Sequence, residues 1–261
     1  MSTSPLSTGS PNAAFTSRVI PALDRMSLVH ALDLVYKLTD LVQIFKGHAL
    51  FDENDIKYTV KKLKLAGARQ IWMDAKFDDT PDTVADRCAK LRDAQVDYIT
   101  VHAMSGPEMI AKAIEAAAPA KIIVVTVLTS FSTERIKSLF KHELQTALVL
   151  ATEAAQAGAK YIVCAGTQVG MLASSPSLLG VKFIVPGTRS TNVATHDQKQ
   201  VVTPYEAVLS GANMLVGGRE VTSAADPTDA VRNMARQIQR AEENIQSAAR
   251  EDDQSRIITT A

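Results

Sequence analysis

The sequence predicts an α/β protein: a closed (β/α)8 barrel of the TIM type, in a single domain. Eight short apolar runs alternate with longer segments in which apolar residues recur at helical spacing. Such alternation favours a parallel sheet covered by helices, and eight units over roughly 230 residues fit a barrel of about 250 residues. An open doubly wound sheet is the alternative, but no Gly-x-Gly-x-x-Gly motif follows the first run.

The runs predicted as strands are about four to eight residues long and rich in Val, Ile or aromatic residues, which suits strands buried on both faces. They are 19–23, 41–45, 70–74, 97–102, 121–128, 160–165, 181–185 and 213–217. Segments such as 55–68 and 82–95 have the apolar spacing of helices. Gly67 and Gly158 stand where helices should end. We expect Trp72, in the third run, to pack between the barrel and its helices.

The two ends of the chain differ in composition from the barrel region, 17–250. Residues 1–16 are rich in Ser, Thr and Pro and lack the basic start and apolar centre of a secretory signal, so we expect a disordered tail. Residues 251–261 are assigned to a C-terminal tail. The charged segment 235–252 is expected to be a helix with a solvated outer face.

The charges of the chain balance. Its 28 basic and 28 acidic residues give a formal net charge of zero, and neither sign collects into a long block. This argues against a nucleic-acid or membrane-surface partner, since both depend on a concentrated basic face. No apolar stretch reaches the ~18 to 20 residues of a membrane helix. Cys88 and Cys164 lack the spacing of a zinc or disulfide framework and indicate reduced thiols in a cytoplasmic protein.

Polar residues gather where the strands are expected to end. In a barrel of this kind the chemistry lies at the carboxyl ends of the strands, in the loops that lead into the helices. The polar residues at those positions are Asp24, Lys46, the 74–83 cluster, His102–Ser105, Thr129 with Ser130, Cys164–Thr167, Pro186–Arg189 and Gly217–Arg219. The five histidines show no metal-ligand spacing. We expect His102 to make a structural hydrogen bond and Cys164 to lie in the core.

The third run ends in an unusual mixture of acids and a lysine. Asp74 and Lys76 should leave the same face of the strand about 6.6 Å apart along it. With Lys46 from the neighbouring strand, and Asp79 nearby, they would form an array of alternating charge in which each group stays ionised. A structural ion-pair network, or a first helical turn that collects acids, is the alternative interpretation. It is weaker for Asp74 and Lys76, because a charged pair that ends an apolar strand is costly unless it is used.

These residues carry a resemblance to a known family. The segment DAKFDDTPDT (74–83) resembles the signature Asp-x-Lys-x-x-Asp-Ile-Pro-x-Thr of the orotidine 5'-monophosphate decarboxylase family. Further similar segments, in the same order over about residues 19 to 240, are PALD (21–24), Lys46, TVLTS (126–130), VPGTR (185–189) with DQ (197–198), and VGGR (216–219). Two departures are Thr80, where the family has isoleucine, and Gly47 directly after Lys46, where the family has one residue between.

The resemblance implies decarboxylation of orotidine 5'-monophosphate to uridine 5'-monophosphate, the last step of de novo pyrimidine synthesis, without a cofactor or metal. The catalytic residues it implies are Lys76, Asp74, Asp79 and Lys46. Lys76 would stabilise and protonate the carbanion at C6, and Asp74 would lie beside the departing carboxylate. The family's homodimer would place Asp79 and Thr83 in the partner's active site.

The resemblance also implies a set of substrate-binding residues. Asp24, with Lys46, would hold the ribose hydroxyls, and Thr129 would contact the pyrimidine, with Ser130 as the alternative. Arg219 suits the phosphate, because a guanidinium beside Gly217 and Gly218 can bind it together with backbone N–H groups. The remaining residues implied at the phosphate end are Pro186, Arg189, Gln198 and Gly218. The polar stretch 188–200, which would carry Gln198, is interpreted as a lid.

Two other functions stay open at this point. One is a sugar-phosphate lyase of the same superfamily, such as hexulose-phosphate synthase or ketogulonate-phosphate decarboxylase. Such enzymes use magnesium and carry an acid where Lys46 stands. The other is a non-catalytic barrel that binds a phosphorylated ligand, against which the complete set of Asp74, Lys76 and Asp79 argues.

Overall fold

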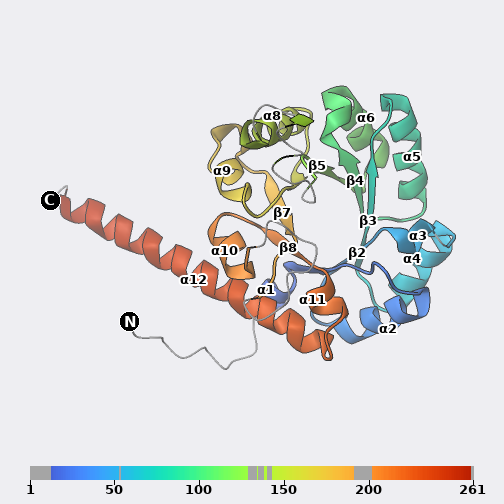
Figure 1. Ribbon diagram of the computed structural model, residues 1–261, viewed down its shortest axis with the longest axis horizontal. Helices are drawn as coiled ribbons and strands as arrows, with labels where there is room; N and C mark the ends of the chain where they lie inside the picture. Colours follow the sequence, from blue (N-terminus) through green and yellow to red (C-terminus); the bar gives the residue numbers. More distant parts are fainter. Residues whose placement is uncertain are drawn as a thin grey trace.

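The protein folds as a (β/α)8 barrel, as predicted. The computed structural model describes residues 13–52, 54–128, 134, 138–139, 143–190 and 202–259. Its eight strands form one sheet in the order β1-β8-β7-β6-β5-β4-β3-β2, and all neighbouring pairs are parallel. A parallel bridge between Ala22 and Lys46 joins the two ends of this order and closes the ring. Figure 1 shows the helices arranged around the outside of the sheet.

The strands are β1 Val19–Pro21, β2 Ile44–Gly47, β3 Gln70–Phe77, β4 Tyr98–His102, β5 Lys121–Val125, β6 Tyr161–Val163, β7 Lys182–Pro186 and β8 Met214–Gly217. The helices within the described residues are α1 Ala13–Thr16, α2 Leu28–Leu38, α3 Ala49–Asp52, α4 Ile56–Leu65, α5 Pro81–Asp93, η1 Ala103–Ser105, α6 Gly106–Ala117, α8 Glu143–Gln156, α9 Val169–Ala173, η2 Pro176–Leu178, α10 Pro204–Leu209, α11 Arg219–Thr222 and α12 Pro227–Thr259. Every predicted strand is present, although β2 starts three residues later than expected and β3 runs three residues further.

Helix ends follow the local signals in the sequence. The side chains of Ser27 and Asp55 accept hydrogen bonds from backbone N–H groups in the first turns of α2 and α4, which stabilises those ends. Gly67 and Gly158 have φ values of 111° and 101° just after helices, a conformation that costs glycine little. Both glycines therefore end helices, as predicted.

Most of the core lies in two clusters, one on each side of the sheet, and a third small cluster is formed by Val127 and Ala147. A larger cluster fills the space between the strands and the helices. A smaller cluster takes its members from all eight strands and fills the inside of the barrel: Ile20, Ala22, Ile44, Trp72, Tyr98, Ile123, Val125, Val163, Ile184 and Val216. Because successive side chains of a strand point to opposite faces, this cluster identifies which residues of each strand point inward.

Trp72 lies inside the barrel, so the expected position between barrel and helices is wrong. It is 2% exposed, and its indole N–H donates to the Thr100 hydroxyl over 2.7 Å. Trp72 is two residues before Asp74, and side chains two apart share a face. A tryptophan inside the barrel is therefore the direct consequence of an inward-pointing Asp74.

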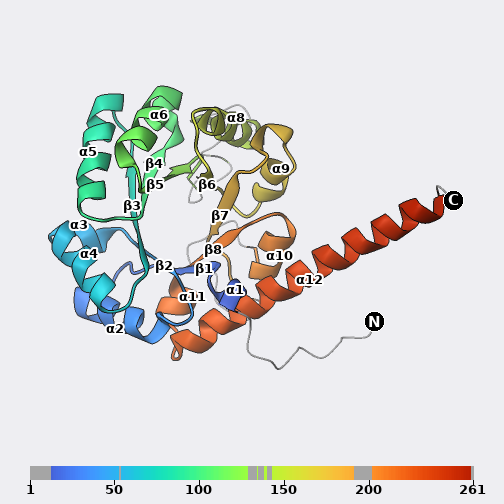
Figure 2. The same cartoon turned by 180° about the vertical axis from the view of Figure 1, so that it is seen from behind.

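The ends of the described chain differ from the expected tails. The last four residues assigned to the N-terminal tail form α1, in which Thr16 is buried, and α1 contacts α12. At the other end α12 continues to Thr259, into the segment assigned to the C-terminal tail. Figures 1 and 2 show α12 crossing the side of the barrel and continuing beyond it.

Burial along α12 changes near its middle. Ala235, Ile238 and Ala241 are buried against the barrel, whereas residues 243–251 are exposed. The expected solvated outer face is therefore present: in the first half of the segment it lies opposite the buried residues and includes the exposed Arg240, and in the second half the described side chains are exposed all round. Within the described part of the chain, no helix combines the length and the apolar character that a bilayer crossing requires.

Candidate active site

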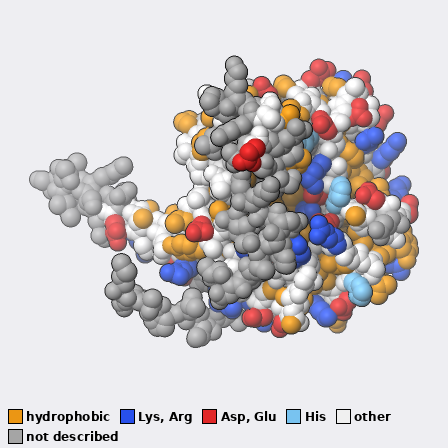
Figure 3. All heavy atoms as spheres, viewed as in Figure 1, with side chains coloured by type: hydrophobic (Ala, Val, Ile, Leu, Met, Phe, Trp, Pro, Cys, Tyr) orange, Lys and Arg blue, Asp and Glu red, His pale blue; other side chains and the backbone are white. Residues whose placement is uncertain are grey.

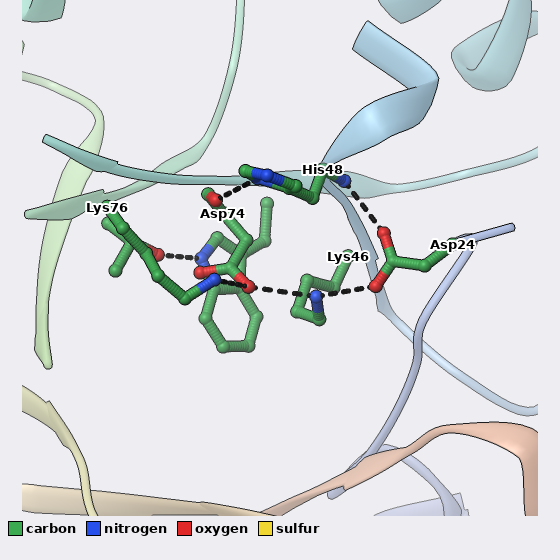
Figure 4. Close-up of polar contacts among 7 residues, drawn as sticks. Asp24, Lys46, His48, Asp74 and Lys76 are labelled. Carbon is green, nitrogen blue, oxygen red and sulfur yellow. Dashed lines mark hydrogen bonds and ion pairs between the residues drawn. The ribbon is translucent and has the colours of Figure 1, made fainter. Parts of the chain in front are cut away.

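The carboxyl ends of β1, β2 and β3 bring Asp24, Lys46 and Asp74 together. Ile44 and Trp72 point into the barrel, so Lys46 and Asp74, each two residues further along, point inward above them. Asp24 follows β1, which is joined to β2 by the bridge at Ala22. Figure 4 shows these side chains converging from three segments on one point.

The charges in this array alternate. Lys46 Nζ donates to Asp24 Oδ2 and to Asp74 Oδ2, each over 2.9 Å. Lys76 Nζ donates to the same Oδ2 atom of Asp74 over 2.6 Å. The order Asp24–Lys46–Asp74–Lys76 therefore places every cation beside an anion, as the sequence predicted for the last three. Lys46 also lies 5.9 Å from the centre of the Trp72 ring, which forms the floor of the array.

The array keeps its buried members charged. Burial alone would raise the pKa of Asp74, but the charges and hydrogen bonds of Lys46 and Lys76 outweigh it and lower this pKa from 3.8 to about 2. Burial would lower the pKa of Lys46, and the charges of Asp74 and Asp24 outweigh it, so that this pKa is raised. Opposite charges at hydrogen-bond distance favour the ionised forms. The site therefore holds a fixed pattern of charge at neutral pH.

Lys76 reaches Asp74 through an irregular backbone. Its φ is 49°, in the left-handed region, which is uncommon for a residue other than glycine. The register between β3 and β4 shifts here: Met73 pairs with Ile99 and Phe77 with Val101, so four steps on β3 face two on β4. The side chain of Lys76 is 36% exposed, whereas those of Lys46 and Asp74 are 10% and 11% exposed. Lys76 and Asp24, whose side chain is 32% exposed, are thus the members of the array that border the open mouth.

His48 is a site residue that the sequence did not predict. Its backbone N–H donates to Asp24 Oδ1 over 2.9 Å, and its ring Nδ1 lies 2.7 Å from the backbone oxygen of Asp74. A carbonyl oxygen can only accept, so Nδ1 carries the hydrogen. His48 therefore ties the end of β2 to Asp24 and to β3 (Figure 4). Its position two residues after Lys46, at the end of a strand, was the available signal.

Asp79 lies just before α5 and Thr83 in its first turn, and their side chains make local contacts. Asp79 accepts from the N–H of Thr80 over 2.7 Å and lies 4.0 Å from Arg87. The hydroxyls of Thr83 and Thr80 are 2.9 Å apart. Within one chain these contacts of Asp79 do not include a member of the array, and the placement of Asp79 near the array stays a prediction. Both residues are on the surface, where a second subunit could reach them.

The ends of β7 and β8 position the residues expected at the phosphate. Pro186 ends β7, and the buried Arg189 donates from Nη1 to the Thr188 oxygen over 2.7 Å. After β8, Arg219 begins the single turn of α11. A Cβ placed on Gly218 would meet nothing within 4 Å. The backbone beside Arg219 therefore borders open space.

Several predicted site residues lie outside the described residues. Thr129, its alternative Ser130 and Gln198 are among them, as is most of the expected lid, 188–200. Of that stretch, residues 188–190 are described.

Figure 3 shows basic side chains and histidine rings gathered on one face of the molecule, over the region of β2 and β3.

Two residues outside the array have the structural roles expected of them. His102 ends β4, and its Nδ1 accepts from the N–H of Met104 over 3.3 Å. Burial and the charge of Lys76 lower the pKa of His102, against the influence of Asp78, and the balance leaves it below the usual value. Cys164 is fully buried after β6, and burial raises the pKa of its thiol to about 12.

The gap between Asp24 and Asp74 is filled by the ammonium of Lys46. A pair of carboxylates around a shared space is a common cation site. Among the described residues, no group of three His, Cys, Asp or Glu side chains is placed to hold a metal ion. The positive charge between Asp24 and Asp74 is therefore that of the Lys46 side chain.

Comparisons with known proteins agree with this geometry. The model of the family described as Orotidine 5'-phosphate decarboxylase / HUMPS matches residues 17–234. An orotidine 5'-phosphate decarboxylase of Carboxydothermus hydrogenoformans is 36% identical over 224 residues, which cover 81% of this chain and 91% of that protein. The corresponding protein of Aquifex aeolicus is 34% identical over 221 residues, covering 81% and 94%.

A solved structure is also similar to this chain. The crystal structure of orotidine 5'-phosphate decarboxylase from Lactobacillus acidophilus matches with a TM-score of 0.71 and 27% identity, and covers 85% of this chain and 99% of that one. Residues 17–234, which the family model matches, contain the array and the ends of β7 and β8. With a family model that spans nearly the whole barrel, these similarities show that the chain belongs to the orotidine 5'-phosphate decarboxylase / HUMPS family.

Proposed function

We propose that this protein decarboxylates orotidine 5'-monophosphate to uridine 5'-monophosphate, the last step of de novo pyrimidine synthesis, with Lys76 as its central catalytic residue. The observation that carries the proposal is the ammonium of Lys76, held 2.6 Å from the buried carboxylate of Asp74 at the mouth of the barrel. The curated relatives cited above bear the decarboxylase name.

The reaction needs fixed charge more than it needs a new bond. Loss of carbon dioxide from C6 leaves an electron pair in the plane of the pyrimidine ring, where it cannot delocalise into the ring. Charge placed beforehand where the negative charge develops stabilises such a transition state. Lys76 supplies that charge, and the same ammonium can then donate a proton to C6. The neighbouring Asp74 accepts a hydrogen bond from this ammonium and holds it in place.

Asp74 has a second role beside the departing group. A substrate carboxylate that lies next to an ionised Asp74 is repelled, and this repulsion disappears as carbon dioxide leaves. The low pKa of Asp74, about 2 in the empty site, means that the substrate carboxylate arrives beside an ionised group. Lys46 balances that charge in the empty site, so Asp74 stays anionic in the barrel mouth without unfolding it.

The remaining parts of the substrate meet the other groups of the mouth. Asp24 and Lys46, which are paired over 2.9 Å, suit the ribose hydroxyls, and Thr129 is assigned to the pyrimidine. The phosphate is assigned to Arg219, with Pro186, Arg189, Gln198 and Gly218 around it. Contacts to a remote phosphate can supply binding energy that holds a closed, dry site around the reacting carbon.

A homodimer completes the site in this proposal. Asp79 and Thr83 are on the surface at the start of α5 and do not contact the array of their own chain. We assign both to the active site of the partner subunit. A cytoplasmic location is assigned as well, because Cys88 and Cys164 are free, buried thiols, as is usual in a reducing compartment.

The magnesium-dependent lyase fits the array less well. Such an enzyme needs acidic ligands, and here Lys46 occupies the space between Asp24 and Asp74. The assay that distinguishes the two follows the absorbance of orotidine 5'-monophosphate in the presence of a metal chelator. Decarboxylation that continues with chelator present supports the proposal, and activity restored only by magnesium contradicts it.

Replacing Lys76 tests the central assignment. We expect Lys76→Ala to lower kcat by at least about 10³-fold, because both the fixed charge and the proton donor are lost. Lys37→Ala serves as the matched control, since Lys37 forms a similar pair with Asp33 over 2.7 Å on the outer helix α2. Near-parental turnover by a folded Lys76→Ala protein, as judged by circular dichroism, would exclude this mechanism.

The charge of Asp74 should be visible in the dependence of stability on pH. Its folded pKa of about 2 lies below the ordinary 3.8, so the ionised group stabilises the fold above about pH 4 and this contribution is lost as the pH falls to about 2. The contribution is about 2 kcal/mol, at about 1.4 kcal/mol per pKa unit. As the pH falls from about 4 to about 2, the free energy of unfolding of the parent should therefore decrease by about 2 kcal/mol more than that of Asp74→Asn.

Denaturant unfolding at a series of pH values measures this difference. The control is Asp33→Asn, in the exposed pair on α2, which should follow the parent because exposed pairs contribute little. Equal losses in Asp74→Asn and the parent would mean that Asp74 is not held ionised by the two lysines.

Arg219→Ala tests the phosphate assignment. We expect kcat/KM for orotidine 5'-monophosphate to fall on the order of 10²-fold, because hydrogen bonds to a charged group contribute about 1.5–3 kcal/mol. The phosphate-free nucleoside orotidine should lose little. A comparable loss with both substrates would speak against a phosphate contact.

Mixed subunits test the dimer. Lys76→Ala and Asp79→Ala proteins should each be inactive alone. In a hybrid dimer with Asp79 acting across the interface, one site carries both defects and the other carries none. Mixing equal amounts with subunit exchange should therefore restore about a quarter of the sites. Absence of any recovery, although native mass spectrometry detects the hybrid, would place Asp79 in the site of its own chain.

A further inference from the structure

Ser190 connects three elements beside the proposed phosphate site. Its backbone N–H lies 3.3 Å from both carboxylate oxygens of Glu220, and its hydroxyl donates to Glu220 Oε1. From α12, Asn233 Nδ2 donates to the Ser190 hydroxyl over 3.2 Å and Gln237 Nε2 over 2.7 Å. Ser190 and Glu220 are 7% and 8% exposed, so this is a buried polar cluster.

Within the cluster, the Ser190 hydroxyl uses its whole capacity for hydrogen bonds. A hydroxyl has one hydrogen to donate and two lone pairs to accept with. Here the hydrogen goes to Glu220, and the two lone pairs receive the amides of Asn233 and Gln237, which are one helical turn apart. Buried polar groups whose hydrogen bonds are all made are held rigidly, because moving one of them would leave its partners buried without a hydrogen bond, which costs free energy.

Ser190 and Glu220 are each adjacent in sequence to an arginine assigned to the phosphate. Ser190 directly follows Arg189 in the segment after β7, and Glu220 directly follows Arg219 after β8. The segment after β7 is also held by a hydrogen bond from the N–H of Arg189 to the Val202 oxygen over 3.0 Å. The contact between Ser190 and Glu220 therefore sets the spacing of two arginine-bearing loops, and α12 serves as their common base.

We propose that Ser190 and Glu220 are positioning residues that place Arg219 for the phosphate of the substrate. This inference rests on the phosphate contact of Arg219 proposed above and adds what holds that arginine in place. Neither Ser190 nor Glu220 touches the phosphate in this arrangement. Their contribution is to keep the guanidinium and the Gly218 backbone in one fixed relation before substrate arrives, which lowers the cost of binding.

Ser190→Ala is the first test, with inhibition by uridine 5'-monophosphate and by uridine as the readout. Loss of the hydroxyl leaves Glu220 with one backbone N–H and leaves two amides without an acceptor. We expect the inhibition constant of the nucleotide to rise about tenfold relative to that of the nucleoside, the effect of one charged hydrogen bond. The ratio of kcat/KM for orotidine 5'-monophosphate to that for orotidine should fall by a similar factor.

Glu220 provides the second test. Glu220→Gln keeps an oxygen that can accept from Ser190 and should retain most of the nucleotide preference, whereas Glu220→Ala should lose it as Ser190→Ala does. Because the two residues act through one contact, the Ser190→Ala/Glu220→Ala double variant should lose no more than either single variant. Additive losses would mean that the two residues act separately and would overturn the proposal.

The control is Thr39→Ala. This change also removes a partly buried hydrogen bond of a hydroxyl, which Thr39 donates to the Gly67 backbone oxygen over 2.5 Å. Thr39 follows the end of α2, and helices of this fold end at the face opposite the active site. Thr39→Ala should leave the nucleotide-to-nucleoside ratio unchanged. If Ser190→Ala weakens both inhibitors equally, its role is only structural and the inference is wrong.

Failure of this inference can be separated from failure of the phosphate assignment. If Arg219→Ala affects nucleotide and nucleoside equally, the phosphate contact itself is absent. If Arg219→Ala is selective for the nucleotide but Ser190→Ala is not, Arg219 binds phosphate without help from Ser190 and Glu220. Selective effects in both variants support the whole arrangement.

Discussion

A single oxygen atom, Oδ2 of Asp74, accepts hydrogen bonds from two ammonium groups, and the rest of the active site depends on it. The ammonium groups of Lys46 and Lys76 would repel each other, and their attraction to the one carboxylate that they share offsets this repulsion. Asp24 and His48 complete the set from neighbouring segments. Such an array costs free energy to bury, and barrel strands offset that cost by delivering each side chain to one edge of the sheet. The fold is thus the condition under which this charge pattern exists before substrate binds.

Much of this was predictable from the sequence, and the reasons are physical. Alternating apolar runs and helical segments require a covered parallel sheet, and the polar residue after each run marks the edge where strands end. Asp24, Lys46, Asp74 and Lys76 were identified in this way and do meet. The contact between Asp74 and Lys76 arises differently from the expected regular strand, because Lys76 has positive φ and β3 shifts its register against β4. Local sequence patterns do not reveal such an irregularity.

Other features could not be predicted from the sequence, because they depend on contacts between segments that are far apart in it. Ser190 and Glu220 are 30 residues apart in the sequence, and no spacing rule links a serine after β7 with a glutamate after β8. Similarly, residues 13–16 of α1 pack against α12, and the Ser- and Pro-rich start gave no signal of this contact. Trp72 is a different case. Its inward direction follows from the same alternation that placed Asp74, and this alternation was not applied to it.

The position of Trp72 gives the protein an intrinsic optical reporter. It is the only tryptophan in the chain, and it lies beneath Lys46 with its ring centre 5.9 Å from the ammonium. Emission excited at the red edge of indole absorption therefore comes from one known point inside the barrel, next to the charges that carry the chemistry. Changes in that emission as a nucleotide enters can be assigned to the floor of the pocket without attaching a dye or altering a residue.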